Sequence, residues 1–259
     1  MIVQGRPISK GKARGNAIVL SSAFSFLGGV NPQSGVLTVS SGKEGESLDG
    51  KVFVFPRGRG STVGSYTLLD LKKNGHLPAA IINERAETIV ATGAVMAGVP
   101  MVDGIDIALV HDGDLVEVDG DQGTVDLLDV ATSEVVTCVL RHDGKILVLK
   151  RSDKVSTNRQ KWAGVSGFVE KGEEPLETAY KEIAEETGVE DPKLVRIGKL
   201  VTIRSEGRIW RIHPFLFEVD SPDIRLDWEH TECRWMAKRE TEGLELVPGF
   251  VKLLSDLDA

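Results

Sequence analysis

The chain has 259 residues, which is too long for one average domain and sufficient for two domains with separate cores. Its formal net charge of −8 disfavours nucleic acid as a partner, because phosphate backbones attract basic surfaces. No stretch approaches the roughly 18 apolar residues of a membrane span, and residues 1–15 lack the apolar segment of a signal peptide, so we expect a cytoplasmic protein that does not bind membranes.

Two β-α-β units are predicted in the first half of the chain. Residues 51–55 and 78–84 have the pattern of buried strands, each is followed by a helical pattern, and residues 99–104 predict a third short strand. Strands that alternate with helices in this way favour a small, at least partly parallel sheet. Residues 25–35 are rich in Gly, Pro and Asn and predict a loop.

A glycine-rich basic turn joins the first of these strands to the first helix. Its sequence Pro-Arg-Gly-Arg-Gly-Ser covers residues 56–61, and we expect the helix to begin at Ser61 or at the residue after it. The free N–H groups and the dipole of a helix N-terminus attract anions. Arg57 and Arg59 add positive charge there, and Gly60 lets the backbone approach a ligand. Taken alone the turn is a weak signal, since Ser61 is equally well explained as a helix N-cap.

A short polar join near residues 129–134 separates a first domain, 1–130, from a second domain, 134–259. Residues 115–128 alternate apolar and polar positions around an Asp-Gly-Asp-Gln-Gly turn and predict a hairpin that closes the first domain. Residues 135–152 then begin a new hairpin with His-Asp-Gly as its turn. The chain is therefore predicted to be an α/β protein of two domains.

The second domain is predicted to combine several strands with two helices. Residues 193–205 and 209–219 are apolar, β-branched and aromatic runs, separated by a turn at Glu206 and Gly207. Residues 248–256 predict the last helix.

The two cysteines, Cys138 and Cys233, lie far apart in the second half of the chain. In a cytoplasmic protein such a pair is expected to be reduced and structural. Two thiolates cannot hold a four-iron cluster, so any such cluster must be carried by another polypeptide.

Residues 167–189 carry the densest chemical signal in the chain. Glu182, Glu185 and Glu186 are spaced i, i+3 and i+4, which places them on one face of a predicted helix. Three adjacent carboxylates repel one another unless a cation lies between them, and a hard divalent metal is the expected cation. A solvated acidic face is the simpler alternative. The metal is favoured by an opposing apolar stripe and a helix-ending glycine, at Leu176, Ala179, Ile183 and Gly188.

The same run resembles the Nudix box, a family signature. The matching positions are Gly167, Glu173, Glu182, Ile183, Glu185, Glu186, Gly188 and Val189. Lys181 departs from the signature, because the family usually has Arg there to orient the carboxylates, and Lys keeps the charge without the fork geometry. The resemblance covers about residues 134–259 and implies an α/β/α sandwich. It also implies Mg²⁺ on Glu182, Glu185 and Glu186, with Glu185 catalytic, and hydrolysis of a diphosphate, typically a nucleoside diphosphate joined to another group.

Nudix enzymes often take a further acid from a loop beyond the box. Glu229 is the candidate here, with Glu232 behind it, and an exposed loop carboxylate is the alternative for Glu229. Trp162 is expected either to stack on a base or ring, or to lie in the core or at its rim. Four cationic side chains are expected either to meet substrate phosphates or to be plain surface charges: Arg151, Arg159, Lys161 and Arg204.

The first domain resembles the small swivelling subunit of the aconitase X family. The match runs in order from about residue 2 to 128 and includes the loop at 25–35 and the turn at 56–61. Family members are iron–sulfur dehydratases, in which a large subunit holds the cluster while the small subunit closes over the substrate and supplies a serine base. The resemblance implies Ser61 as that base and a large-subunit partner that brings the cluster. It also implies substrate-binding roles for Arg57, Arg59 and Gly60. The two arginines would either stabilise the serine alkoxide or bind a carboxylate or phosphate of the substrate.

Several substrates and roles stay open at this point. The archaeal branch with a separate small subunit resembles phosphomevalonate dehydratase, which converts mevalonate 5-phosphate to trans-anhydromevalonate 5-phosphate in a route to isoprenoids, and a bacterial branch acts on hydroxyproline. For the second domain, a nucleotide substrate and a prenyl diphosphate from the same route are alternatives. Both domains could also be non-catalytic, the first docking on a partner and the second sensing a nucleotide. Lys181 favours that alternative, and the intact carboxylates oppose it.

Overall fold

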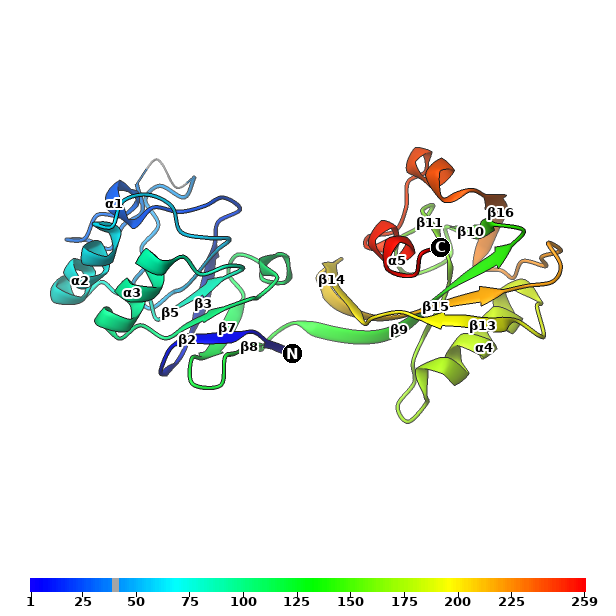
Figure 1. Ribbon diagram of the computed structural model, residues 1–259, viewed down its shortest axis with the longest axis horizontal. Coiled ribbons are helices and arrows are strands. Elements are labelled where there is room, and N and C mark those ends of the chain that lie inside the picture. The colour runs from blue at the N-terminus through cyan, green and yellow to red at the C-terminus, as the bar shows by residue number, and fades with distance from the viewer. Residues whose placement is uncertain (39–41) are drawn as a thin grey trace. The chain divides into compact units, whose positions relative to one another are not determined.

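Two separate sheets make up the structure of the protein, a computed structural model that describes residues 1–38 and 42–259. The chain divides into two units, Met1–Val130 and Ala131–Ala259, and each unit has its own core (Figure 1). Within the described residues, no helix combines the length and the apolar character needed to cross a bilayer.

Parallel strands form the centre of the sheet in the first unit. The elements are β3 (Lys12–Val19), β4 (Val52–Phe55), α2 (Gly64–Asn74), β5 (Ala80–Asn83), α3 (Thr88–Ala97) and β6 (Met101–Asp103). β3 pairs with β4, β4 with β5 and β5 with β6, all in parallel. α2 and α3 connect successive parallel strands, so the right-handed crossover rule places both on the same face of the sheet, as Figure 1 shows. The two predicted β-α-β units are confirmed.

Antiparallel strands complete this sheet on both sides. They are β1 (Ile2–Gln4), β2 (Arg6–Ser9), β7 (Leu115–Asp119) and β8 (Thr124–Leu127), and the strand order is β1-β8-β7-β3-β4-β5-β6-β2. β7 and β8 form the predicted closing hairpin, and the 3-10 turn η2 (Ile107–Leu109) precedes it. Within the predicted loop, the short turn α1 (Phe26–Gly29) is non-helical at Leu27 and Gly28, so this segment is irregular as expected.

A cluster of four phenylalanines packs beside the glycine-rich turn. They are Phe24, Phe26, Phe53 and Phe55, all buried, with ring centroids 4.8–6.1 Å apart. The Phe24 N–H donates to the Arg57 carbonyl (3.0 Å), and the Arg59 N–H donates to the Phe24 carbonyl (2.9 Å). These backbone hydrogen bonds to a buried phenylalanine therefore fix the position of residues 57–59 of the turn.

Asp103, at the end of β6, is a buried carboxylate that pairs with the exposed side chain of Arg6. Its carboxylate accepts hydrogen bonds from Arg6 Nη2 (2.7 Å) and Nε (2.9 Å) and from the Ala86 N–H (2.8 Å), while its side chain is 3% exposed. Burial alone raises the pKa of Asp103, but the hydrogen bonds from Arg6 and Ala86 outweigh it and hold the pKa below its usual value. A pKa that is depressed in the folded state gives stability above the unfolded value of about 4, and this stability is lost as pH falls through the folded value.

We expect Asp103→Asn to lower the free energy of unfolding by about 1 to 3 kcal/mol at neutral pH, because charge-assisted hydrogen bonds are weakened at a buried position. The variant should also lose acid sensitivity, so that its stability falls less than that of the wild type between about pH 5 and pH 2. Thermal unfolding of both proteins across this range makes the comparison. Parallel pH profiles would contradict the role assigned to Asp103.

A long central strand organises the sheet of the second unit. Its strands are β9 (Ala131–His142), β10 (Lys145–Arg151), β11 (Trp162–Ala163), β12 (Val165–Phe168), β13 (Lys193–Ile197), β14 (Val201–Ser205), β15 (Arg208–Glu218) and β16 (His230–Met236). β9 pairs in parallel with β15 and antiparallel with β10 and β12, while β16 pairs with β10, and β13 and β14 pair with β15. The predicted turns at Asp143–Gly144 and Glu206–Gly207 are confirmed, and all four residues have positive φ.

Residues 131–134, expected in a polar join, are instead the first residues of β9. They pair with Arg208–Arg211 of β15. Glu134 also forms an ion pair with Arg211 (2.6 Å) of that strand, and its carboxylate lies 3.4 Å from His213 Nε2. The segment has no strand pattern in its own sequence. It is a strand because it pairs with β15, which lies far downstream in the chain.

Helices cover both faces of this sheet, α4 (Pro175–Thr187) on one and α5 (Phe250–Asp256) on the other (Figure 1). Val136 and Cys138 of β9 lie in a core with α4, whereas Val135 and Val139 lie in a second core with α5. The predicted α/β/α sandwich is confirmed, and the last helix follows the 3-10 turn η3 (Lys238–Gly243) and begins at Phe250. Both cysteines are free thiols.

Candidate functional site

The three carboxylates of α4 differ in exposure. Glu186 is buried, Glu182 is half-buried and Glu185 is exposed. The packing of the helix explains this gradient, because Ala179 and Ile183 face the sheet and Glu186 lies further along the same side. The predicted acidic face therefore has one carboxylate inside the domain, one at its edge and one in solvent.

Both ends of α4 are held by residues of the predicted pattern. Gly188 ends the helix in the left-handed conformation (φ 72°), and its N–H donates to the Ala184 carbonyl (3.0 Å). Glu173 precedes the helix, and its carboxylate accepts from Thr178 Oγ1 (3.0 Å) and from the Glu170 N–H (3.3 Å), which lowers the pKa of Glu173. Glu173 therefore ties the preceding loop to the first turn of α4, and Gly188 ends the helix.

The carboxylate of Glu182 fills the space that Gly167 leaves by lacking a side chain. A Cβ built on Gly167 would lie 2.0 Å from Glu182 Cδ. Gly167 belongs to β12, which pairs with β9 beside α4. A larger residue at this position would push Glu182 out of its place.

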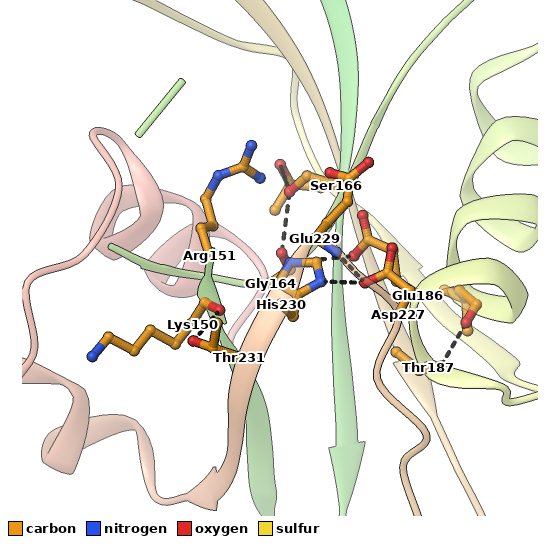
Figure 2. Close-up of polar contacts among 12 residues, drawn as sticks. Lys150, Arg151, Gly164, Ser166, Glu186, Thr187, Asp227, Glu229, His230 and Thr231 are labelled. Carbon is orange, nitrogen blue, oxygen red and sulfur yellow. Dashed lines mark hydrogen bonds and ion pairs between the residues drawn. The ribbon is translucent and has the colours of Figure 1, made fainter. Parts of the chain in front are cut away.

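A buried histidine faces Glu186 across a short gap. His230 begins β16, and its side chain is 0% exposed. Its Nδ1 lies 3.0 Å from Asp227 Oδ1, and its Nε2 lies 3.8 Å from Glu186 Oε2 (Figure 2). Neither His230 Nε2 nor Glu186 Oε2 has a hydrogen-bond partner among the described residues, whereas the Ser166 backbone is hydrogen-bonded to the Glu186 carboxylate.

Burial and like charge raise the pKa values of this carboxylate group. Burial raises the pKa of Glu186 well above its usual value, and the charges of Glu182 and Asp227 add to the effect. Burial and then Glu185 raise the pKa of Glu182, and burial and then Asp227 raise the pKa of Glu229. Ionising these carboxylates together therefore costs free energy, and a cation bound nearby would reduce that cost.

A pocket of about 490 Å³ opens beside Glu182 and Glu229. Its charged and polar lining includes Arg151, Lys154, Asn158, Ser166, Lys181, Glu182 and Glu229. Its apolar lining includes Val135, Ile203, Trp210, Ile212, Val247 and Pro248. Phe168 and Trp228 also line it and are 49% and 61% exposed. Such a lining suits a molecule with a charged end and an apolar or aromatic end.

Of the four cationic side chains considered as phosphate ligands, one lines the pocket. Arg151 lines the pocket, while Arg159, Lys161 and Arg204 are not among the described residues that line it. Arg159 Nε donates to the Val155 carbonyl (2.8 Å). Exposed Glu185 is also outside the lining.

Trp162 and Glu232 both lie outside the lining of the pocket. Trp162 is 5% exposed, it belongs to the core beside α5, and the Arg234 guanidinium lies 4.7 Å from its ring centroid. Of the two alternatives for Trp162, the core position is therefore the one that the structure supports. Glu232 accepts a hydrogen bond from Arg234 Nε (2.7 Å) on the surface and does not line the pocket.

In the first unit, Ser61 lies just ahead of α2 rather than at its first position. The helix begins at Gly64, because the Gly64 N–H donates to the Ser61 carbonyl (2.9 Å) and closes a turn before the helix. Ser61 Oγ accepts a long hydrogen bond from the Val63 N–H (3.3 Å). Gly60 has φ of 105°, and a Cβ there would lie 2.8 Å from Ser25 Oγ, so the turn requires glycine. The predicted residues of the turn are all exposed: Arg57, Arg59, Gly60 and Ser61.

The carboxylates of the second unit fit a divalent cation by their chemistry. They supply hard oxygen ligands, one buried oxygen of Glu186 has no partner among the described residues, and the raised pKa values reflect charge that a cation would compensate. In this conformation, no three His, Cys, Asp or Glu side chains within residues 1–38 and 42–259 are gathered around one point.

We expect Gly167→Ala to displace Glu182 and to weaken divalent-metal binding by about tenfold or more. The effect on folding should be smaller, because the Glu182 side chain can rotate away. Gly243→Ala is the matched control, since a Cβ at Gly243 would meet nothing within 4 Å. Mn²⁺ binding measured by electron paramagnetic resonance, together with thermal unfolding, tests this. Equal Mn²⁺ affinities of the two variants would rule out the importance of the contact.

Sequence reasoning missed part of this site. It singled out Glu229 in the loop before β16 and passed over Asp227 and His230, and it also missed the pocket aromatics Phe168 and Trp228. The signal that could have revealed His230 is a histidine at the first position of a strand, directly after an acidic loop.

Comparison with known proteins accounts for both halves of the chain. Residues 2–127 match the family model of the aconitase X swivel domain, and residues 131–256 match that of the NUDIX domain. The phosphomevalonate dehydratase small subunit of Thermococcus sibiricus is 54% identical over 128 residues, which make up 49% of this chain and 98% of that subunit. The chain belongs to the aconitase X swivel family and continues as a Nudix domain.

Other proteins match single halves in the same way. The phosphomevalonate dehydratase small subunit of Methanocaldococcus jannaschii is 50% identical over 129 residues, covering 50% of this chain and 99% of its own. Among solved structures, the holo-form of Thermococcus kodakaraensis aconitase X is 51% identical (TM-score 0.49; 50% of this chain, 99% of that one). The MutT protein of Methanosarcina mazei is 26% identical (TM-score 0.46; 51% and 96%). The small subunits consist almost entirely of the swivel domain, so the added Nudix domain distinguishes this chain from them.

Proposed function

We propose that this chain is the small subunit of a phosphomevalonate dehydratase joined to a Mg²⁺-dependent Nudix diphosphate hydrolase. The two activities are proposed on different residues, and each is tested separately.

For the Nudix domain, the proposal is carried by one observation: Glu182 and Glu229 line the same pocket as Arg151 and Lys181. Cations beside carboxylates suit a diphosphate that is bound next to a divalent ion. Glu182, Glu185 and Glu186 would hold Mg²⁺, which when bound supplies positive charge to the diphosphate and promotes attack by water.

The other pocket residues have proposed roles in binding and proton transfer. Arg151 and Lys181 bind phosphate oxygens. Glu229 takes up the proton of the attacking water, and its raised pKa brings it closer to neutral pH, where such a base is most effective. Lys181, in place of the usual Arg, contacts a phosphate as a point charge rather than through a fork.

The substrate that this pocket supports best is a nucleoside diphosphate derivative. Phe168 and Trp228 present exposed rings to it, and Asn158 and Ser166 offer hydrogen-bonding groups for a base or sugar. A prenyl diphosphate is the second candidate, because Val135, Ile203, Ile212 and Val247 give the pocket an apolar lining that suits a hydrocarbon chain.

Phosphate release from a panel of nucleoside and prenyl diphosphates in the presence of Mg²⁺ tests the hydrolase. Cleavage of nucleoside derivatives alone eliminates the prenyl candidate, and the opposite result eliminates the nucleotide. Tight nucleotide binding without cleavage of any compound would mean that the domain is a sensor.

For the swivel domain, the proposal rests on 54% identity over nearly the whole length of a phosphomevalonate dehydratase small subunit. Ser61 removes a proton from the substrate, and Arg57 and Arg59 hold its phosphate or carboxylate or stabilise the serine alkoxide. A large subunit is the partner, and its iron–sulfur cluster supplies the Lewis acid for the leaving hydroxyl. Mevalonate 5-phosphate is the proposed substrate and a hydroxyproline the alternative.

Reconstitution with a phosphomevalonate dehydratase large subunit tests the swivel domain. The complex should convert mevalonate 5-phosphate to trans-anhydromevalonate 5-phosphate and leave hydroxyproline unchanged. Failure of the two chains to co-purify would remove the subunit assignment.

A further inference from the structure

His230 is buried beside the proposed metal ligands, yet it is not exposed to the pocket and has no part in the mechanism above. We propose that His230 is a positioning residue for Glu186: its Nε2 holds the Glu186 carboxylate in the orientation that binds a divalent ion, and Asp227 holds the imidazole. The inference rests on the proposed metal-dependent function of the Nudix domain.

Two buried polar atoms face each other where His230 meets Glu186. His230 Nε2 and Glu186 Oε2 lie 3.8 Å apart, and neither has another partner among the described residues. Buried polar atoms without partners are rare in folded proteins because they lose their hydration without compensation. The contact between these two atoms is therefore the compensation open to both within the described residues.

The imidazole of His230 is held on its other side by Asp227. Asp227 Oδ1 lies 3.0 Å from His230 Nδ1 and also accepts from the Glu229 N–H (3.1 Å). The Glu229 carbonyl in turn accepts from the Ser152 N–H (2.7 Å), which ties the loop to the end of β10. The loop that presents Glu229 to the pocket therefore also sets the position of His230 behind Glu186 (Figure 2).

The Glu186 carboxylate keeps oxygen positions at which an ion can bind. The Ser166 backbone is hydrogen-bonded to the Glu186 carboxylate, and His230 approaches it at Oε2. Each carboxylate oxygen can accept two bonds, so a carboxylate held in this way keeps acceptor positions for a metal. A ligand held by outer partners binds metal more tightly than a free one, because its orientation is already set.

A purely structural role for His230 is the alternative, in which it only fills the core at the start of β16. The two roles differ in their effect on metal binding. A structural role changes the unfolding temperature alone, while a positioning role changes Mn²⁺ affinity in a protein that is still folded.

Two substitutions of His230 in the full chain separate these roles. Asn can keep the contact with Asp227 but has no atom near the place of Nε2, whereas Gln extends an amide toward Glu186. We expect His230→Asn to weaken Mn²⁺ binding, followed by electron paramagnetic resonance, by about ten- to a hundredfold. His230→Gln should restore most of the lost affinity. If both variants keep wild-type affinity, or if both lose it equally, the proposed role of Nε2 is wrong.

Reference proteins keep this test separate from the test of the hydrolase. If the wild-type protein binds no Mn²⁺, the proposed function itself is overturned. If the wild type binds Mn²⁺ and its affinity falls in Glu186→Gln but not in His230→Asn, only the role of His230 is overturned. Thermal unfolding shows which variants are folded. If His230→Asn does not fold, Asp227→Asn replaces it, since that side chain is part-exposed, and unchanged Mn²⁺ affinity there would overturn the proposal.

Discussion

Glu186→Gln should reduce diphosphate hydrolysis by about a hundred- to a thousandfold and should raise the thermal stability of the metal-free protein. The loss of activity follows from the loss of a charged ligand for the ion that supports the reaction. The gain in stability follows from burial: Glu186 is inside the domain, one of its oxygens has no partner among the described residues, and its pKa lies well above the usual value. Gln keeps the shape and removes the charge.

The sign of the pH dependence is opposite to that of Asp103. Because the folded-state pKa of Glu186 is raised, its contribution to stability is complete below the unfolded pKa of about 4.3 and is lost as pH rises through the folded value. In the presence of a chelator, wild type should therefore lose stability relative to Glu186→Gln as pH rises from about 4. Thermal unfolding over pH measures this, with the exposed Glu185→Gln as the control for stability. Identical unfolding temperatures at neutral pH, or undiminished hydrolysis, would contradict the role of Glu186.

Ser61→Ala should reduce dehydration in the complex with the large subunit by about a hundred- to ten-thousandfold, the usual contribution of a general base. Folding should be unaffected, since Ser61 is exposed and the hydrogen bond that its Oγ accepts from the Val63 N–H is long, at 3.3 Å. Thr62→Ala is the matched control, because it removes the neighbouring exposed hydroxyl. Steady-state dehydration by the three reconstituted complexes gives the comparison.

Assembly must be measured alongside this activity. Co-purification with the large subunit should be equal for wild type, Ser61→Ala and Thr62→Ala. A Ser61→Ala complex that assembles and turns over at the wild-type rate would remove Ser61 from the mechanism. Equal losses in both variants would point to the conformation of the turn rather than to one hydroxyl.

Local patterns were sufficient where the sequence itself carries the geometry. The spacing of Glu182 and Glu186 against Ala179 and Ile183 predicted both the helix α4 and its two faces. Gly188 predicted where the helix ends. These features depend on residues a few positions apart, which is the range over which helical periodicity acts.

Features assembled from distant segments were not predictable in this way. His230 reaches Glu186 because β16 pairs with β10, and no pattern within either segment encodes that pairing. The start of α2 was placed too early for a related reason: the hydrogen bond from the Gly64 N–H to the Ser61 carbonyl forms a turn that composition alone does not separate from a helix. Trp162 was ambiguous because the side on which an aromatic residue packs depends on strands elsewhere.

The start of β9 has a practical consequence for anyone who wishes to excise the hydrolase. Ala131–Glu134 pair with Arg208–Arg211, and the first unit ends at Val130. A fragment that starts at Val135 would leave one end of β15 with unpaired backbone groups and would deprive Arg211 of its carboxylate partner. A fragment that contains the intact hydrolase domain should therefore begin at Ala131, directly after Val130.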